Sequence, residues 1–123
     1  MEMTDAVASL SALAHGGRLS AFRMLVQAGA TGLAAGEIAR RLEMLPNSLS
    51  SHLAILENAG LIHARREGRS IIYTADYGAM QGLLGFLLED CCGGAPEICA
   101  PLGAIFARAA ACDGTCLPDP KTA

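Results

Sequence analysis

Apolar residues recur at helical spacing along most of this 123-residue chain, but the pattern changes between positions 61 and 74. A repeat of about three to four residues is typical of helices that bury one face. The exception is a pair of short apolar runs, 61–64 and 71–74, on either side of charged residues and Gly68. Two such runs around a glycine-containing turn indicate a β-hairpin. The sequence therefore predicts a mainly α fold with one small hairpin.

Composition narrows both the fold and the function. With 52% hydrophobic and 17% charged residues, the chain can form one core, and its length fits one domain. Aromatic residues are only 4% and tryptophan is absent, which argues against a surface that stacks RNA bases. No stretch approaches the roughly 20 apolar residues that cross a bilayer, and acidic residues near the start do not resemble a leader peptide. We expect a cytoplasmic protein without a membrane partner.

Glycine and proline divide the helical pattern into segments. Gly16 and Gly17 end the first apolar repeat, residues 29–32 end the second, and a turn containing Pro46 precedes the fourth. The predicted helices cover 7–13, 19–26, 35–42, 46–58 and 77–88, with a smaller one at 102–111.

The helix at 77–88 carries a seam of apolar residues. The seam consists of Tyr77, Met80, Leu84 and Leu87. Steps of three and four residues are typical of a helix that packs against a partner helix, so we expect this helix to mediate dimerisation. Burial of the seam within one chain is the alternative, because a single domain also needs its own core.

Short polar side chains occupy the first turns of the helix at 46–58. They are Asn47, Ser48 and Ser51. A helix enters the DNA major groove only with a slim leading face, and these groups can hydrogen-bond to base edges or phosphates. Because a short helix at 35–42 and a tight turn precede it, the pair has the outline of a helix-turn-helix.

A basic hairpin follows this helix pair. Its arginines, Arg65, Arg66 and Arg69, could reach phosphates or the adjacent minor groove. The formal net charge is −3, yet residues 34–75 hold five arginines against four glutamates. Ordinary solvated surfaces are the alternative explanation of these charges. The helix pair and the hairpin together predict a winged helix-turn-helix that binds double-stranded DNA.

Three stretches of the chain resemble the ArsR/SmtB family of metalloregulatory repressors. The opening stretch is ALAHGGRLSAFRML, the recognition-helix stretch is LSSHLAILENAGLI, and the wing stretch is RREGRSIIYTA. The resemblance spans roughly residues 10–88. It implies a homodimer through the first and last long helices that leaves its operator DNA when a metal or metalloid binds.

The resemblance also assigns roles along the recognition helix, which it places at 46–58. The residues nearest the bases are Asn47, Ser48 and Ser51. The residues nearer the phosphates are Ser50 and His52. Leu45 departs from the family pattern, because many relatives have a serine or threonine cap there, although Pro46 partly replaces that signal.

Three of the five cysteines cluster after the last long helix. They are Cys91, Cys92 and Cys99. An odd number of cysteines without a secretory signal favours thiol or metal chemistry over a disulfide framework. Adjacent cysteines in an intact helix point about 100° apart, so a break at Gly93 would help them to meet one ion.

The donor set predicts the inducer. Three thiolates form a soft site, and zinc would usually require a fourth ligand. As(III) is satisfied by three sulfurs, and so is Sb(III), so we expect As(III), and secondarily Sb(III), as the inducer. The resemblance agrees, since some arsenite-responsive relatives carry a cysteine pair and a third cysteine at this end of the dimer helix. The Cys-x-Cys pair that other relatives carry at 35–42 is absent, and no histidine follows His63.

The expected organisation is therefore a DNA-binding and dimerisation domain at 1–90 and a metalloid-binding segment at 91–123. Cys112 and Cys116 could add ligands, bind a second ion or have no role. The same cluster could also respond to Cd²⁺, Pb²⁺, Zn²⁺ or thiol oxidation. A metalloid carrier or a thiol enzyme is a further alternative, but no His/Asp partner set for catalysis accompanies the cysteines, and we expect no enzyme.

Overall fold

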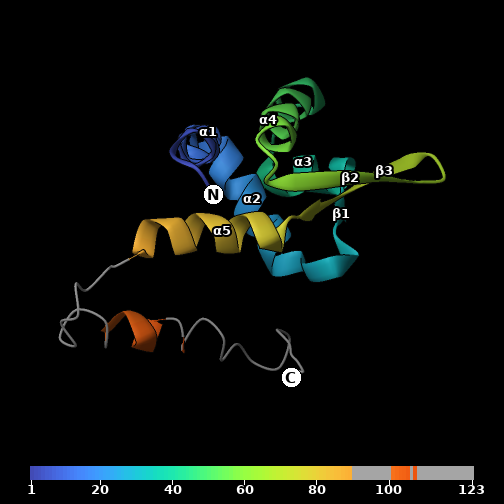
Figure 1. Cartoon of the computed structure of the whole chain (residues 1–123). Coiled ribbons are helices and arrows are strands. Elements are labelled where there is room, and N and C mark those ends of the chain that lie inside the picture. Colours follow the sequence, from blue (N-terminus) through green and yellow to red (C-terminus); the bar gives the residue numbers. More distant parts are fainter. Residues whose placement is uncertain (90–100, 106, 108–123) are drawn as a thin grey trace. The chain divides into compact units, whose positions relative to one another are not determined.

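The computed structural model describes residues 1–89, 101–105 and 107 (Figure 1). Residues Met1–Phe86 form one compact unit. The elements, in chain order, are α1 Met3–Leu13, α2 Gly16–Ala28, the 3-10 turn η1 Gly29–Thr31, β1 Leu33–Ala34, α3 Ala35–Leu42, α4 Pro46–Asn58, β2 Ile62–Glu67, β3 Ser70–Ala75 and α5 Tyr77–Leu88. Further along the chain, 101–105 and 107 are helical, so the expected helix at 102–111 is helical where it is described.

A histidine cap, and not the glycine pair, separates the first two helices. His15 is the N-cap of α2, and its Nδ1 accepts a hydrogen bond from the Gly17 backbone N–H at 3.0 Å. On the other side of the turn, Arg18 Nε donates to the Ala12 carbonyl at 2.5 Å. These two bonds satisfy the end of α1 and the start of α2. The helices are therefore separated at Ala14 and His15, two residues before the break predicted at Gly16 and Gly17.

The core consists mainly of aliphatic side chains, in keeping with an aromatic content of only 4%. Its fully buried large side chains are Leu25, Ile38, Leu49, Leu53, Leu56, Leu61 and Ile62. The three leucines of α4 are the apolar positions that define this helix in the sequence, and α4 lies against α2 and α3. Burial of these leucines fixes which face of α4 remains in solvent.

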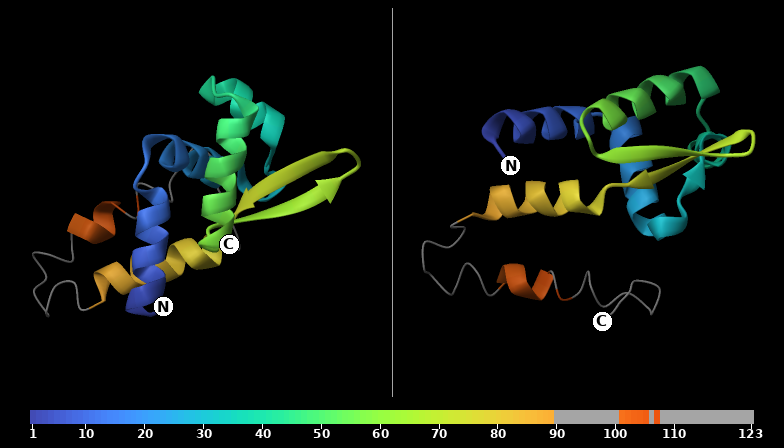
Figure 2. Two further views of the ribbon diagram at one scale, coloured as in Figure 1. Left: turned by 90° about the horizontal axis from the view of Figure 1, so that it is seen from above. Right: turned by 45° about the vertical axis from the view of Figure 1, so that its right-hand side comes forward.

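The described strands form a three-stranded antiparallel sheet in the order β1-β3-β2. Glu67 pairs with Ser70, which leaves a two-residue turn at the tip of the predicted hairpin. The hairpin projects beyond the helices in both views of Figure 2. Strand β1 is a third strand that the sequence pattern did not predict, because its two residues, Leu33 and Ala34, are too few to show alternation.

Gly32 allows β1 to approach β3. Its φ of 71° lies in the region that favours glycine, and a Cβ there would collide with the Tyr73 carbonyl oxygen. The side chains of Thr74 and Ile72 would also lie within 2.7 and 2.9 Å of that Cβ. The sheet can therefore gain its third strand only where this residue lacks a side chain.

The apolar seam of α5 is divided between two environments. Tyr77 and Met80 pack against the core, and the Tyr77 hydroxyl donates to the Val26 carbonyl at 2.8 Å. Leu84 and Leu87 are 38% and 51% exposed. Burial within the chain thus accounts for the first half of the seam only. None of the described helices is long and apolar enough to cross a membrane.

Candidate nucleic-acid interface

The first turns of α4 present short polar groups to solvent. Asn47, Ser48, Ser50 and Ser51 are all exposed, whereas Leu49 between them is buried. Pro46 begins the helix, where its missing N–H costs nothing. The Ser51 hydroxyl donates to the Asn47 carbonyl at 3.4 Å, a local bond that an incoming acceptor could replace. This face has the slim, hydrogen-bonding character that entry into a major groove requires.

His52 differs from its polar neighbours because it turns toward α2. Its ring lies 4.5 Å from that of His15, measured between centroids. Its Nδ1 is buried without a hydrogen-bond partner in the described part of the chain. Burial lowers the pKa of His52 below its ordinary value, and the nearby His15 and Arg18 lower this pKa further. The predicted contact of His52 with phosphate stays a prediction, and the structure shows the ring packed beside His15.

The pH dependence of stability should reveal this packing. Because the pKa of His52 is lowered by folding, the unfolded chain takes up the proton first as the pH falls through about 6.5. The free energy of unfolding should therefore decrease from pH 7.5 to 5.5, and it should decrease less in His52→Gln. Urea titrations at fixed protein concentration measure this difference. Equal pH dependence in the two proteins would contradict the assignment.

The three arginines of the hairpin have different surroundings. Arg65 Nε pairs with Glu67 Oε2 at 2.7 Å, and its terminal nitrogens donate to the carbonyls of Ala30 at 3.4 Å and Thr31 at 3.0 Å. Arg65 thus ties the hairpin to η1. By contrast, Arg66 and Arg69 are exposed and make no ion pair among the described residues. These two arginines are the ones whose charge is available to a phosphate.

Alanine substitutions should distinguish Arg65, which is bonded to η1, from the exposed Arg66 and Arg69. Arg66→Ala and Arg69→Ala should weaken binding to all duplexes alike and reduce the slope of log affinity against log salt by about 1 per lost phosphate contact. Arg65→Ala should instead lower the free energy of unfolding by up to about 1 kcal/mol, because it removes hydrogen bonds to η1. Fluorescence anisotropy at several salt concentrations and urea unfolding test both expectations. A larger loss of salt slope in Arg65→Ala than in the other two would contradict them.

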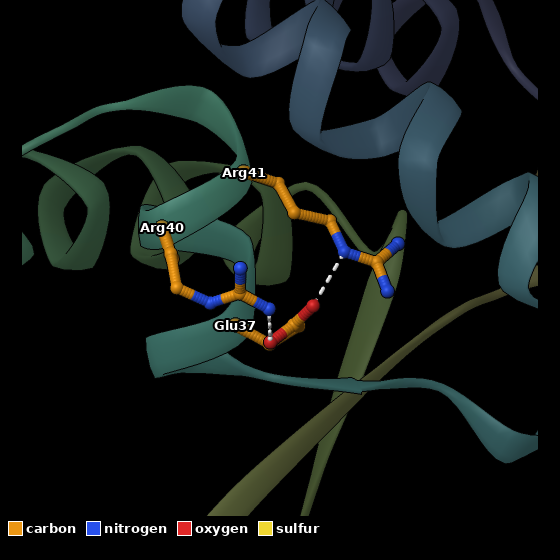
Figure 3. Close-up of polar contacts among 3 residues, drawn as sticks. All are labelled: Glu37, Arg40 and Arg41. Carbon is orange, nitrogen blue, oxygen red and sulfur yellow. Dashed lines mark hydrogen bonds and ion pairs between the residues drawn. The ribbon is translucent and has the colours of Figure 1, made fainter.

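The adjacent arginines of α3 share one carboxylate. Figure 3 shows Arg40 and Arg41 directed at Glu37, which pairs with Arg40 and, at 2.6 Å, with Arg41. Hydrogen bonds from Arg40 and then Arg41 hold the pKa of Glu37 below its ordinary value. Glu37 therefore stays ionised and offsets part of the positive charge that the sequence concentrates in this pair.

A polar link joins the base of the hairpin to α5. His63 Nε2 lies 2.6 Å from Asp76 Oδ2, and Asp76 Oδ1 accepts from the Ala79 backbone N–H at 2.8 Å. The Ala79 N–H, and then His63, hold the pKa of Asp76 low, so this carboxylate is ionised at neutral pH. The sequence pattern did not predict this link, although an aspartate directly before a helix is a recognisable cap signal.

The predicted metal ligands cannot be placed in this surface. Cys91, Cys92, Cys99, Cys112 and Cys116 all lie outside the described residues. Within the described residues, no group of three or more histidine, cysteine, aspartate or glutamate side chains could hold a metal ion.

Comparisons with known proteins agree with this geometry. A model of the helix-turn-helix domain family matches residues 13–65. The transcriptional activator HlyU of Vibrio cholerae is 34% identical over 82 residues, which are 67% of this chain and 73% of HlyU. The helix-turn-helix-type transcriptional regulator YgaV of Escherichia coli is 32% identical over 88 residues, which are 72% of this chain and 87% of YgaV.

Solved structures extend the likeness to three dimensions. HlyU from Vibrio cholerae superposes with a TM-score of 0.57 at 37% identity, covering 71% of this chain and 97% of HlyU. A second structure, of reduced HlyU, gives a TM-score of 0.54 at 34% identity, covering 68% of this chain and 88% of that one. A third structure is the homodimeric winged helix-turn-helix DNA-binding domain of Mb0332 from Mycobacterium bovis, a possible ArsR-family transcriptional regulator. It superposes with a TM-score of 0.59 at 26% identity, covering 72% of this chain and 82% of that one.

The fold, the exposed face of α4 and these relatives define a winged helix-turn-helix transcriptional regulator that binds DNA and is not an enzyme. Mainly helical architecture with a small antiparallel wing, as the sequence predicts, is confirmed. The chain belongs to the ArsR family of transcriptional regulators.

Proposed function

We propose that this protein is a cytoplasmic, homodimeric repressor of a metalloid-resistance operon and that As(III), or Sb(III), releases it from its operator. The observation that carries the proposal is the run of Cys91, Cys92 and Cys99 soon after α5 ends at Leu88. Three thiolates without a histidine form a donor set that suits a trivalent metalloid better than zinc. When bound, As(III) would supply three As–S bonds. Cys112 and Cys116 are further candidate ligands.

Operator binding is proposed to use α4 and the wing. The exposed groups of Asn47, Ser48 and Ser51 would face the bases, and Ser50 and His52 would lie nearer the phosphates. Arg66 and Arg69 would contact phosphates, while Arg65 holds the wing in place. The separate environments of the three arginines support this division of roles.

Homodimerisation is supported by apolar residues that one chain leaves in solvent. On α1, Met3, Val7 and Leu10 are 66%, 56% and 43% exposed, and they lie on one helical face. Leu84 of α5 is also exposed, and together with Phe22 and Leu83 it lines an apolar cavity of about 400 Å³. Contiguous exposed apolar side chains usually mark an interface, and Mb0332 is described as homodimeric.

The link between Asp76 and His63 offers a route from α5 to the wing. Asp76 caps the first turn of α5 and holds β2, so a displacement of α5 would be felt at the base of the hairpin. Couplings between two sites are typically worth about a 5- to 150-fold change in affinity. A change of this size is sufficient for a regulatory switch.

Thiol oxidation is the second candidate signal. The relative HlyU is named an activator, and one of its solved structures is of the reduced protein. A cysteine cluster that responds to oxidation would form disulfides or sulfenic acids, which dithiothreitol reverses. On this alternative the chain would keep the same DNA-binding surface and respond to an oxidant instead of a metalloid.

Fluorescence anisotropy of the reduced protein on its own upstream DNA tests these candidates. The complex is titrated separately with arsenite, antimonite, Cd²⁺, Zn²⁺ and hydrogen peroxide. Release at stoichiometric arsenite supports the proposal, and release by peroxide that dithiothreitol reverses supports the redox alternative. Tight binding that is indifferent to arsenite would overturn the proposed inducer. Absence of sequence-selective binding would overturn the proposed operator function.

A further inference from the structure

Leu45 is an apolar side chain placed in solvent beside the polar face of α4. It is 74% exposed, the highest value among the exposed large apolar side chains of the described residues. The residue before it, Met44, packs against the core. Leu45 has an extended backbone, with φ −66° and ψ 141°, and its side chain does not share the partial burial of Met44. The core therefore draws Met44 inward and leaves Leu45 outside.

The fold does not require a leucine at this position. Leu45 is the N-cap of α4, where serine, threonine, aspartate or asparagine would satisfy a free N–H group. Leucine has no polar side-chain atom with which to do this. Its backbone carbonyl accepts from the Leu49 N–H at 3.0 Å, but any residue could supply that bond. Neither capping nor core packing explains a side chain of this kind here.

The position of Leu45 indicates what it could contact. It directly precedes Pro46, Asn47 and Ser48, the leading turn that we place in the major groove. The apolar group that the edges of the base pairs present in this groove is the C5-methyl of thymine. We propose that Leu45 packs on a thymine methyl group and makes the protein prefer thymine beside the bases that Asn47 and Ser48 face.

This inference rests on the proposed placement of α4 in the groove, but it is independent of the inducer. A protein partner is a weaker explanation, because beyond the exposed Pro46 the next surface residues are polar: Asn47, Ser48, Ser50 and Ser51. Protein interfaces need a contiguous apolar patch, such as the one on α1.

Replacement of thymine by uracil tests the contact, because uracil lacks only the methyl group. Duplexes are first selected from a random pool with the wild-type protein, and each thymine of the selected site is then replaced singly. At one or two thymines per half-site, removal of the methyl group should lower the affinity of the wild-type protein for the duplex about three- to tenfold. In Leu45→Ala the same replacements should cost less than about twofold, because the apolar partner is gone.

Two further variants sharpen the comparison. Leu45→Met keeps an apolar side chain of similar volume and should keep the uracil effect. Ile55→Ala removes an apolar side chain that is 41% exposed later on the same helix, and it should leave the uracil effect unchanged. If replacing thymine by uracil changes affinity equally in the wild type and in Leu45→Ala, the inference about Leu45 is overturned, but the proposed operator function is not. Failure of the wild type to select any sequence would overturn both the inference and the proposed operator function.

Discussion

Cys91→Ser is expected to bind operator DNA as tightly as the wild type and to stay bound when arsenite is added. A serine hydroxyl is a hard, neutral donor and does not replace a thiolate in a soft site. The proposed coupling between inducer and DNA, about 5- to 150-fold, should therefore fall to nearly 1. DNA binding should survive, because the groups of α4 and the wing lie in the unit Met1–Phe86. Anisotropy with and without arsenite measures both quantities.

Matched cysteine variants give this experiment its control. Cys92→Ser and Cys99→Ser should behave like Cys91→Ser if the three thiols form one site. Cys116→Ser should retain release if the last two cysteines are not needed. A Cys91→Ser protein that still leaves DNA at stoichiometric arsenite would contradict the assignment of Cys91.

Gly32→Ala is expected to cause a large loss of stability. The residue has φ 71° and ψ −171°, a region that is essentially restricted to glycine and costs about 1–3 kcal/mol for other residues. Crowding adds to this cost, because the new Cβ would meet the Tyr73 carbonyl oxygen, and a backbone atom in a sheet cannot easily move. Such overpacking should lower the free energy of unfolding by about a further 2 kcal/mol. Urea unfolding at fixed protein concentration measures the total.

Gly29 supplies the control for this prediction. Its φ of 75° and ψ of −160° nearly match those of Gly32, but a Cβ there would have nothing within 4 Å. Gly29→Ala should therefore show the backbone cost alone. Equal losses in Gly29→Ala and Gly32→Ala would show that contact between β1 and β3 is looser than the structure indicates.

Local patterns were sufficient to predict most elements. The buried Leu49, Leu53 and Leu56 follow helical spacing in α4, and the two apolar runs around the charged turn became β2 and β3. These predictions succeeded because helix and hairpin formation depend on neighbours close in the chain. The two-residue strand β1 escaped prediction, since its partner, β3, is distant in sequence and two residues carry no periodicity.

The roles of individual polar residues depend on contacts between distant segments. The sequence treats Arg65, Arg66 and Arg69 alike, but only the tertiary structure brings the carbonyl of Thr31, 34 residues away, to Arg65. In the same way His52 turns toward His15, although the polar residues just before it on α4, Ser50 and Ser51, face solvent.

By itself the sequence determined the winged helix-turn-helix architecture and the slim polar face of α4, because periodicity and side-chain size are local properties. The tertiary structure alone decided which arginines remain available to phosphates and which apolar residues remain in solvent. Those outcomes depend on which partners the folded chain places within hydrogen-bonding or packing distance, and spacing along the sequence does not contain that information.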